Sequence, residues 1–174
     1  SLIKPFEIDI FVPEFKLGIE YHGAYWHSYD RSEVKKEKLK HQNKALMAIQ
    51  NGINLKQFYC FEWNNNKDLI KSMLDCYCGN NVKLNARDCN FLVVSNEDVK
   101  DFLDQNHLQG HRNASICVGL FYDNQLVSVA TFSKKDDGYE LIRLASKRGL
   151  TIMGGPSKLI TNSFKIFKFP KLYT

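Results

Sequence analysis

The alternation of hydrophobic and polar residues near the start of the chain predicts a pair of β-strands. Residues 6–12 and 17–22 both repeat with a period of two, as strands with one buried face do. The segment between them is four residues long and contains a proline, which suits a turn. The pattern therefore predicts an antiparallel hairpin in which Val12 lies opposite Leu17.

The next segments alternate between helical and strand patterns. From Asp30 to Gln50 hydrophobic residues recur at helical spacing among many lysines, which predicts a helix. Gly52 follows at the position where a helix C-cap is expected. Residues 53–61 form a mostly hydrophobic run typical of a buried strand. Residues 66–78 predict a second helix, capped by one of three adjacent asparagines. Together these elements predict a compact α/β domain over residues 1–78.

The pattern starts again after residues 79–90, a polar stretch that we interpret as a linker. The expected elements beyond it are a helix at 96–107 capped by Ser95 or Asn96, a hairpin turning at Asp123-Asn124, a strand at 138–146 and a helix led by Gly154-Gly155. Residues 91–174 thus predict a second α/β piece, which we expect to be truncated.

Charge and cysteine usage narrow the functional classes. Lys and Arg total 24 against 19 Asp and Glu, a net charge of +5 that permits binding to a phosphate backbone. Five cysteines without regular spacing fit free thiols in a reducing compartment. Neither a membrane-spanning run nor a signal peptide is evident, so we expect an intracellular protein with no membrane partner.

The predicted hairpin brings two carboxylates together. Counting back from the turn, Asp9 lies opposite Glu20, with Cβ atoms about 4.5 to 5.5 Å apart. Like charges at that spacing are destabilising unless something offsets them, and Mg²⁺ or Mn²⁺ would do so. His22 lies two residues after Glu20 and therefore on the same face. The alternative interpretation is a solvated pair of acids on the outer face of an edge hairpin.

These residues resemble a known family. Asp9, Glu20-Tyr21-His22 and the string HGAYWHS resemble very-short-patch-repair (Vsr) type endonucleases, in particular the Vsr-like homing endonucleases with an E-D-x-H-D pattern. That group is a branch of the PD-(D/E)XK nuclease superfamily. The likeness covers residues 5 to about 78 and includes HQNKALMAIQNGINLKQFYCFEW. It implies a mixed sheet flanked by helices and Mg²⁺-dependent hydrolysis of DNA.

The resemblance also implies roles for individual residues. Asp9 would be the central metal ligand, with Glu20 as the second acid and the backbone carbonyl of Tyr21 as a further ligand. His22 replaces the lysine of the common nuclease motif and would act as a base or orient the attacking water. His27 would assist the leaving group or a second metal.

Aromatic and basic residues of the same region are candidates for DNA contacts. Tyr25 and Trp26 match positions that wedge between bases in the repair enzymes, although packing in the core is an equal alternative. His41 and Lys44 share one helix face and would approach the scissile phosphate, although a solvated lysine is the plainer interpretation for Lys44 taken alone. Lys40 belongs to a lysine cluster suited to nonspecific phosphate contacts, or simply to a solvated face.

The chain also departs from the family pattern. Ala24 stands where the repair enzymes carry a cysteine that binds zinc, so no structural zinc is expected. Homing members use a carboxylate upstream of the first strand; here either Glu7 takes its place or that group is missing. Glu62 could support the metal ligands, and a helix cap or surface residue is the plainer interpretation for it.

Residues 91–174 resemble the acetyltransferase-like (GNAT-fold) module that follows Vsr-like nucleases in phage proteins. Gly154 and Gly155 precede a helix, an arrangement that binds anions in true acetyltransferases. Because the later strands of that fold are absent, coenzyme A is not expected. A further polar group that could form a site or contact DNA contains His107, Gln109, His111 and Arg143.

The combined prediction is a phage or homing type endonuclease that cuts double-stranded DNA inside a bacterial cell. The alternatives are an acyl-CoA-dependent transferase and a DNA-binding protein without catalytic activity. The sequence specifies neither the DNA target nor the oligomeric state.

Overall fold

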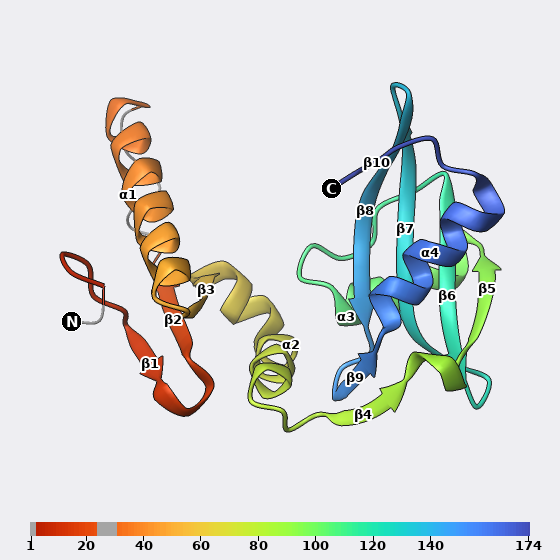
Figure 1. Ribbon diagram of the computed structural model, residues 1–174, viewed down its shortest axis with the longest axis horizontal. Coiled ribbons are helices and arrows are strands. Elements are labelled where there is room, and N and C mark those ends of the chain that lie inside the picture. Colours follow the sequence, from red (N-terminus) through yellow and green to blue (C-terminus); the bar gives the residue numbers. More distant parts are fainter. Residues whose placement is uncertain (1–2, 24–30) are drawn as a thin grey trace. The chain divides into compact units, whose positions relative to one another are not determined.

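The computed structural model describes residues 3–23 and 31–174, with the side chains of residues 31–38 not described. The fold is mixed α/β, and the chain divides into two compact units, Ser1–Lys67 and Asp68–Thr174 (Figure 1). Each unit has its own sheet and its own hydrophobic core.

The first unit is built on a three-stranded mixed sheet. Its strands are β1 (Ile10–Val12), β2 (Leu17–His22) and β3 (Asn54–Tyr59), in the order β1-β2-β3. β1 and β2 form the predicted antiparallel hairpin, and Val12 pairs with Leu17 as expected. A short 3-10 helix, η1 (Pro13–Phe15), makes the turn. β3 pairs with β2 in parallel, so the chain must cross over between these two strands.

Helix α1 (Arg31–Gln50) provides this crossover and packs on the sheet. Ala48 on the helix is fully buried with Ile3 and Ile53, which form the centre of the hydrophobic core of this unit. Gly52 follows the helix with φ of 68°, the left-handed conformation that glycine adopts most easily after a helix end. The predicted helix and its glycine stop are both confirmed.

Helix α2 (Cys60–Tyr77) begins earlier than the sequence predicts, because residues 60 and 61 belong to the helix rather than to the preceding strand. The Glu62 carboxylate accepts a hydrogen bond of 3.0 Å from the backbone amide of Tyr59, which stabilises this helix start. Asn66 has non-helical angles (φ −134°, ψ 35°) and interrupts the helix where an asparagine cap was predicted.

The second unit contains a five-stranded sheet in the order β10-β8-β7-β6-β5. Its strands are β5 (Asn90–Val94), β6 (Ile116–Tyr122), β7 (Gln125–Lys135), β8 (Gly138–Ser146) and β10 (Leu172–Tyr173). Only β10 runs parallel to its neighbour, while the other pairs are antiparallel. Asp123 and Asn124 link β6 to β7 with φ of 47° and 61°, as a tight hairpin turn requires.

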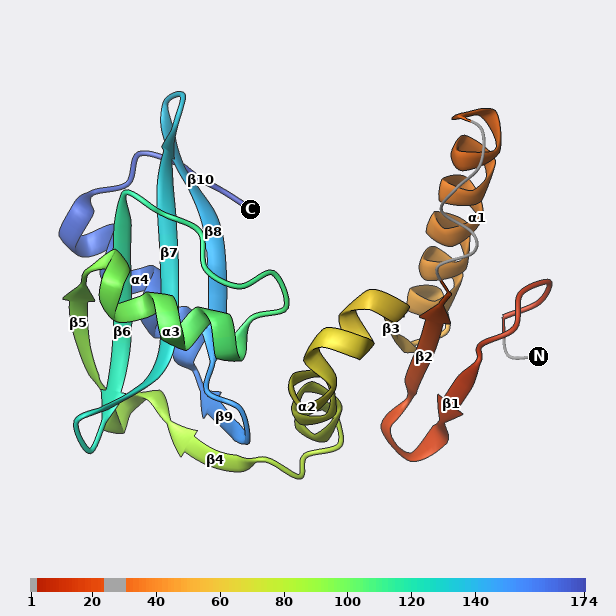
Figure 2. The ribbon, with the colours of Figure 1, turned by 180° about the vertical axis from the view of Figure 1, so that it is seen from behind.

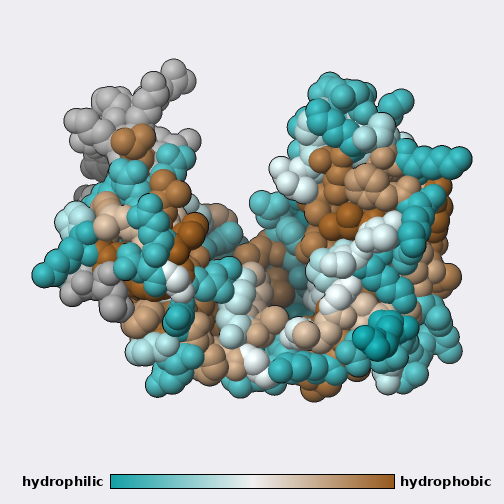
Figure 3. Space-filling model, viewed as in Figure 1, coloured by the Kyte–Doolittle hydropathy of each residue, from teal (hydrophilic) through white to brown (hydrophobic). Residues whose placement is uncertain are grey.

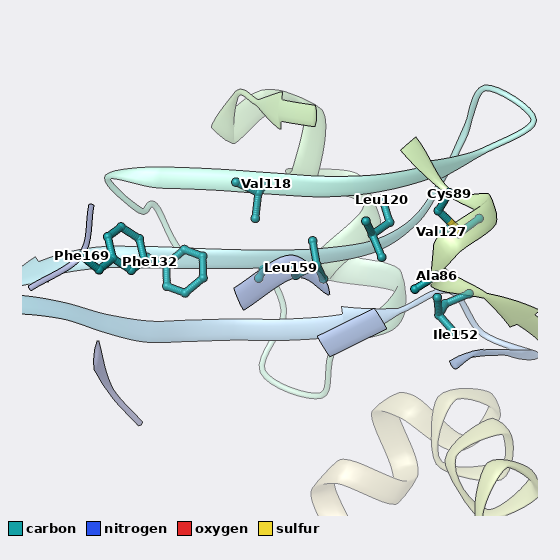
Figure 4. Packing of buried hydrophobic residues seen from close by; sticks show 10 residues of the cluster. Ala86, Cys89, Val118, Leu120, Val127, Phe132, Ile152, Leu159 and Phe169 are labelled. Carbon is teal, nitrogen blue, oxygen red and sulfur yellow. The ribbon is translucent and has the colours of Figure 1, made fainter. Parts of the chain in front are cut away.

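Two helices cover opposite faces of this sheet, α4 (Gly155–Phe167) on one and α3 (Asn96–Asn106) on the other (Figures 1 and 2). Leu159 of α4 packs with Val118, Leu120 and Phe132, and Figure 4 shows these side chains gathered between helix and sheet. Not every hydrophobic side chain of α4 is buried, since Ile166 is 54% exposed. Figure 3 shows hydrophobic residues on the surface of this unit.

The predicted linker at 79–90 differs from the observed organisation. It contains β4 (Val82–Asn85), which pairs in parallel with β9 (Leu150–Met153), and a short 3-10 helix, η3 (Ala86–Asp88). Ala86 and Cys89 are buried in the core of the second unit. A polar stretch read alone does not reveal this partner strand, which lies more than sixty residues further along the chain.

Helix α3 starts with the predicted Ser95 cap in a reciprocal capping box with Asp98. Hydrogen bonds from the Ser95 hydroxyl and amide lower the pKa of Asp98 below its model-compound value of 3.8. A lowered folded-state pKa gives stability that is complete above the unfolded pKa and is lost as the pH falls through the folded value.

We therefore expect Asp98→Asn to destabilise the protein at neutral pH and to differ least from wild type in strong acid. Urea unfolding followed by circular dichroism from pH 7 down to pH 2 would measure the convergence. Asp101→Asn, on the exposed side of the same helix, is the control. A gap between wild type and Asp98→Asn that stays constant with pH would contradict this role for the carboxylate.

Candidate functional site

One face of the first sheet gathers the polar residues predicted from the sequence. Glu20 and His22 are two residues apart on β2, so their side chains lie on the same face of the sheet. The parallel register places Gln57 beside Glu20 and Tyr59 beside His22. Asp9 immediately precedes β1 at the level of Glu20. The face therefore combines a glutamate, a histidine, an amide and a tyrosine on β2 and β3 with the aspartate that precedes β1.

Asp9 and Glu20 are held together by reciprocal backbone contacts. The amide of Asp9 donates to Glu20 Oε1 at 3.1 Å, and the amide of Tyr21 donates to Asp9 Oδ2 at 2.8 Å. Asp9 is exposed, whereas Glu20 is only 4% exposed. The predicted pairing of the two acids across the hairpin is thus present, with one acid facing solvent and the other buried.

Lys44 of α1 forms an ion pair with Glu20 Oε2. The Lys44 and Glu20 side chains are 13% and 6% exposed, so this pair is largely shielded from water. The Lys44 ammonium group and two backbone donors offset part of the repulsion between the acids. Part of the charge compensation from which a metal was inferred in the sequence therefore comes from Lys44, while Asp9 has no ammonium partner among the described contacts.

His22 is surrounded by polar and aromatic partners. Its Nε2 lies 3.1 Å from Gln57 Oε1. The ring of His41 meets it edge-on at a centroid distance of 4.7 Å, and the ring of Tyr59 lies at 5.1 Å. His41 and Lys44 of α1 therefore both point at the sheet face that carries Glu20 and His22, as their predicted common helix face requires.

Asp9 and Glu20 together offer few free oxygen atoms to a divalent cation. Within the described residues, no group of three or more His, Cys, Asp or Glu side chains is arranged to hold a metal ion. Mg²⁺ commonly uses one or two carboxylates and fills its remaining positions with water and substrate oxygens. Asp9 Oδ1 is the best-suited oxygen, since both Glu20 oxygens already accept hydrogen bonds.

The other residues named from the sequence fall in several places. Tyr21 is 49% exposed, and Glu7 and Lys40 are exposed as well. Glu62 caps α2 at the end of β3, which is the plainer of its two predicted roles. Tyr25, Trp26 and His27 lie outside the described residues.

The glycine pair at the start of α4 has a structural explanation. Gly154 has φ of 77°, which favours glycine, and a Cβ on Gly155 would lie 3.0 Å from Ile152 side-chain atoms. Lys158, one turn into the helix, donates to the carbonyls of Ala86 and Cys89. Packing and backbone geometry therefore account for this sequence without an anion.

The polar residues of the second unit do come together. Arg143 on β8 donates through Nε to the Gly110 carbonyl at 2.9 Å, and the Gln109 amide donates to His107 Nδ1. Burial and the neighbouring charge of Arg143 lower the pKa of His107. The His111 amide donates to Asp104 Oδ1 at 2.7 Å. These contacts tie the loop after α3 to the sheet, which is a structural role.

Gln57 and Tyr59 are the members of the site that sequence reasoning missed. A signal was present, because both lie on the same face of the predicted strand 53–61 by the period of two. The missing information was the register between β2 and β3, which is parallel and is not set by a turn.

Comparisons with known proteins found no match to a family model, a curated protein or a solved structure. Among the described residues, no helix is both long enough and apolar enough to cross a membrane.

Proposed function

We propose that the chain is a metal-dependent DNA endonuclease of the homing or phage type, with the catalytic site in the first unit. The observation that carries the proposal is the meeting of Asp9, Glu20, Lys44 and His22 at one sheet face. This arrangement joins an exposed carboxylate, a buried acid–lysine pair and a histidine. The resemblance to Vsr-like PD-(D/E)XK nucleases supports the same assignment.

Each residue has a defined task in this proposal. Asp9, with Glu20 as the second acid, would hold Mg²⁺ or Mn²⁺, which when bound would supply Lewis-acid polarisation of the phosphodiester. Lys44 pairs with the Glu20 carboxylate and holds it next to Asp9. His22 takes a proton from the attacking water. His41, whose ring contacts His22, helps to hold the imidazole in place.

The substrate is double-stranded DNA. The basic composition of the chain supports this choice, and the exposed Lys40 of α1 offers a phosphate contact one residue before His41. We assign the second unit to a GNAT-like accessory role. Its strand order and the parallel β10 beside β8, reached through α4, support the GNAT resemblance, while its paired glycines already have a structural explanation.

The test is cleavage of supercoiled plasmid by the full chain in Mg²⁺, in Mn²⁺ and in EDTA. We expect nicked or linear product with either metal and none in EDTA. Asp9→Asn purified in the same way controls for a contaminating nuclease. Binding without cleavage in every condition would favour the noncatalytic DNA-binding alternative. Coenzyme A binding, measured by calorimetry, would favour the transferase alternative.

A further inference from the structure

The contact between His22 and Gln57 determines which ring nitrogen carries the hydrogen. His22 Nε2 faces the Oε1 atom of Gln57 at 3.1 Å. An amide oxygen only accepts hydrogen bonds, so with Gln57 Oε1 as its partner Nε2 is the donor. In the neutral imidazole the lone pair then lies on Nδ1.

The surroundings of Gln57 make this contact a fixed one. Gln57 lies in the middle of β3, paired in register with Glu20 of β2, so its backbone is held by the sheet. Both Gln57 and His22 are partly buried. The rings of His41 and Tyr59 contact the imidazole and restrict its rotation. The hydrogen bond therefore sets the tautomer of a ring whose position is already constrained.

The choice of an amide at position 57 has an electrostatic consequence. A carboxylate here would face the Glu20 carboxylate across the strand pair, and the two like charges would repel each other. The neutral glutamine oxygen orients the ring without adding a negative charge beside Glu20. Gln57 thus suits a position beside a buried carboxylate.

We propose that Gln57 is a positioning residue: it accepts from Nε2–H of His22 and keeps Nδ1 as the nitrogen that takes the proton of the attacking water. This inference rests on the proposed nuclease function. The water transfers one proton to Nδ1 while its oxygen bonds to phosphorus. The bond from phosphorus to the leaving oxygen breaks, that oxygen is protonated by solvent, and the imidazolium releases its proton to solvent.

The first experiment measures the tautomer directly in the full-length protein. Nitrogen-15 NMR of the histidine rings, recorded in alkaline buffer where the imidazoles are neutral and with His22 assigned by its loss in His22→Gln, reports which nitrogen is protonated. We expect hydrogen on Nε2, with a slowly exchanging Nε2–H signal that disappears in Gln57→Met. Hydrogen on Nδ1 in the wild type, or an unchanged Nε2–H signal in Gln57→Met, would overturn the proposal.

The second experiment measures steady-state cleavage. Gln57→Met is expected to lower kcat about 10- to 100-fold, as loss of a partner that orients a functional histidine does, with little change in KM. Gln50→Met, at the exposed end of α1, is the matched control and should retain wild-type kcat. A wild-type kcat in Gln57→Met would refute the positioning role.

The two measurements separate the positioning inference from the nuclease function. A wild-type protein that does not cut DNA with any metal contradicts the nuclease function, and the NMR result still decides whether Gln57 sets the tautomer. If Gln57→Met does not fold, the wild-type tautomer measurement decides the inference by itself.

Discussion

Asp9→Asn is expected to lower DNA cleavage by at least about 10²- to 10³-fold, the usual cost of removing one preorganised electrostatic contact from an active site. Asparagine keeps a side-chain oxygen that can accept from the Tyr21 amide, so the hairpin contact is preserved. It removes the negative charge that faces solvent beside Glu20. The variant should therefore fold normally and lose the chemical step.

Plasmid cleavage in Mg²⁺ is the measurement for Asp9→Asn, with DNA affinity followed by fluorescence anisotropy. Glu14→Gln is the matched control, because Glu14 is an exposed acid in the turn of the same hairpin and lies outside the site. We expect Glu14→Gln to cut like the wild type. Full activity in Asp9→Asn would remove Asp9 from the catalytic site and with it the proposed function.

Lys44→Met is expected to lower the free energy of unfolding of the first unit by about 3–5 kcal/mol, the usual cost of leaving one partner of a buried ion pair alone. Glu20 is 4% exposed, so its carboxylate would lose its ammonium partner in a largely water-excluded place. Methionine retains most of the length and the apolar stem of lysine. The loss should therefore be mainly electrostatic.

Denaturant unfolding followed by tryptophan fluorescence suits this prediction, because both tryptophans, Trp26 and Trp63, belong to the first unit. Lys40→Met, at an exposed position of the same helix, should change stability by less than about 0.5 kcal/mol.

The double variant Glu20→Gln with Lys44→Met completes the cycle. It should recover part of the loss, because the buried charge is also removed. A single Lys44→Met variant as stable as Lys40→Met would show that the ion pair contributes little to stability.

Local sequence signals predicted the parts of the fold that depend on neighbouring residues. The four-residue turn set the pairing of Val12 with Leu17 and hence brought Asp9 to Glu20. Ser95 and the turn at Asp123-Asn124 were identifiable for the same reason, since capping and tight turns involve residues within a few positions of each other.

Contacts between segments that are far apart in the chain could not be predicted from these local signals. Gln57 is 35 residues from His22, and Lys44 is 24 residues from Glu20. The first contact depends on the register of a parallel strand pair, and the second on how α1 lies across the sheet. The pairing of β4 with β9, which turned a predicted linker into a strand, has the same origin.

The sequence by itself determined the α/β class, the hairpin and the face on which Asp9, Glu20 and His22 lie, because a period of two and a short turn act locally. The tertiary structure decided that Lys44 pairs with Glu20 and that Gln57 lies within hydrogen-bond distance of His22. Those partners are chosen by the packing of a crossover helix and a parallel strand, and both depend on the burial of surfaces far apart in the chain.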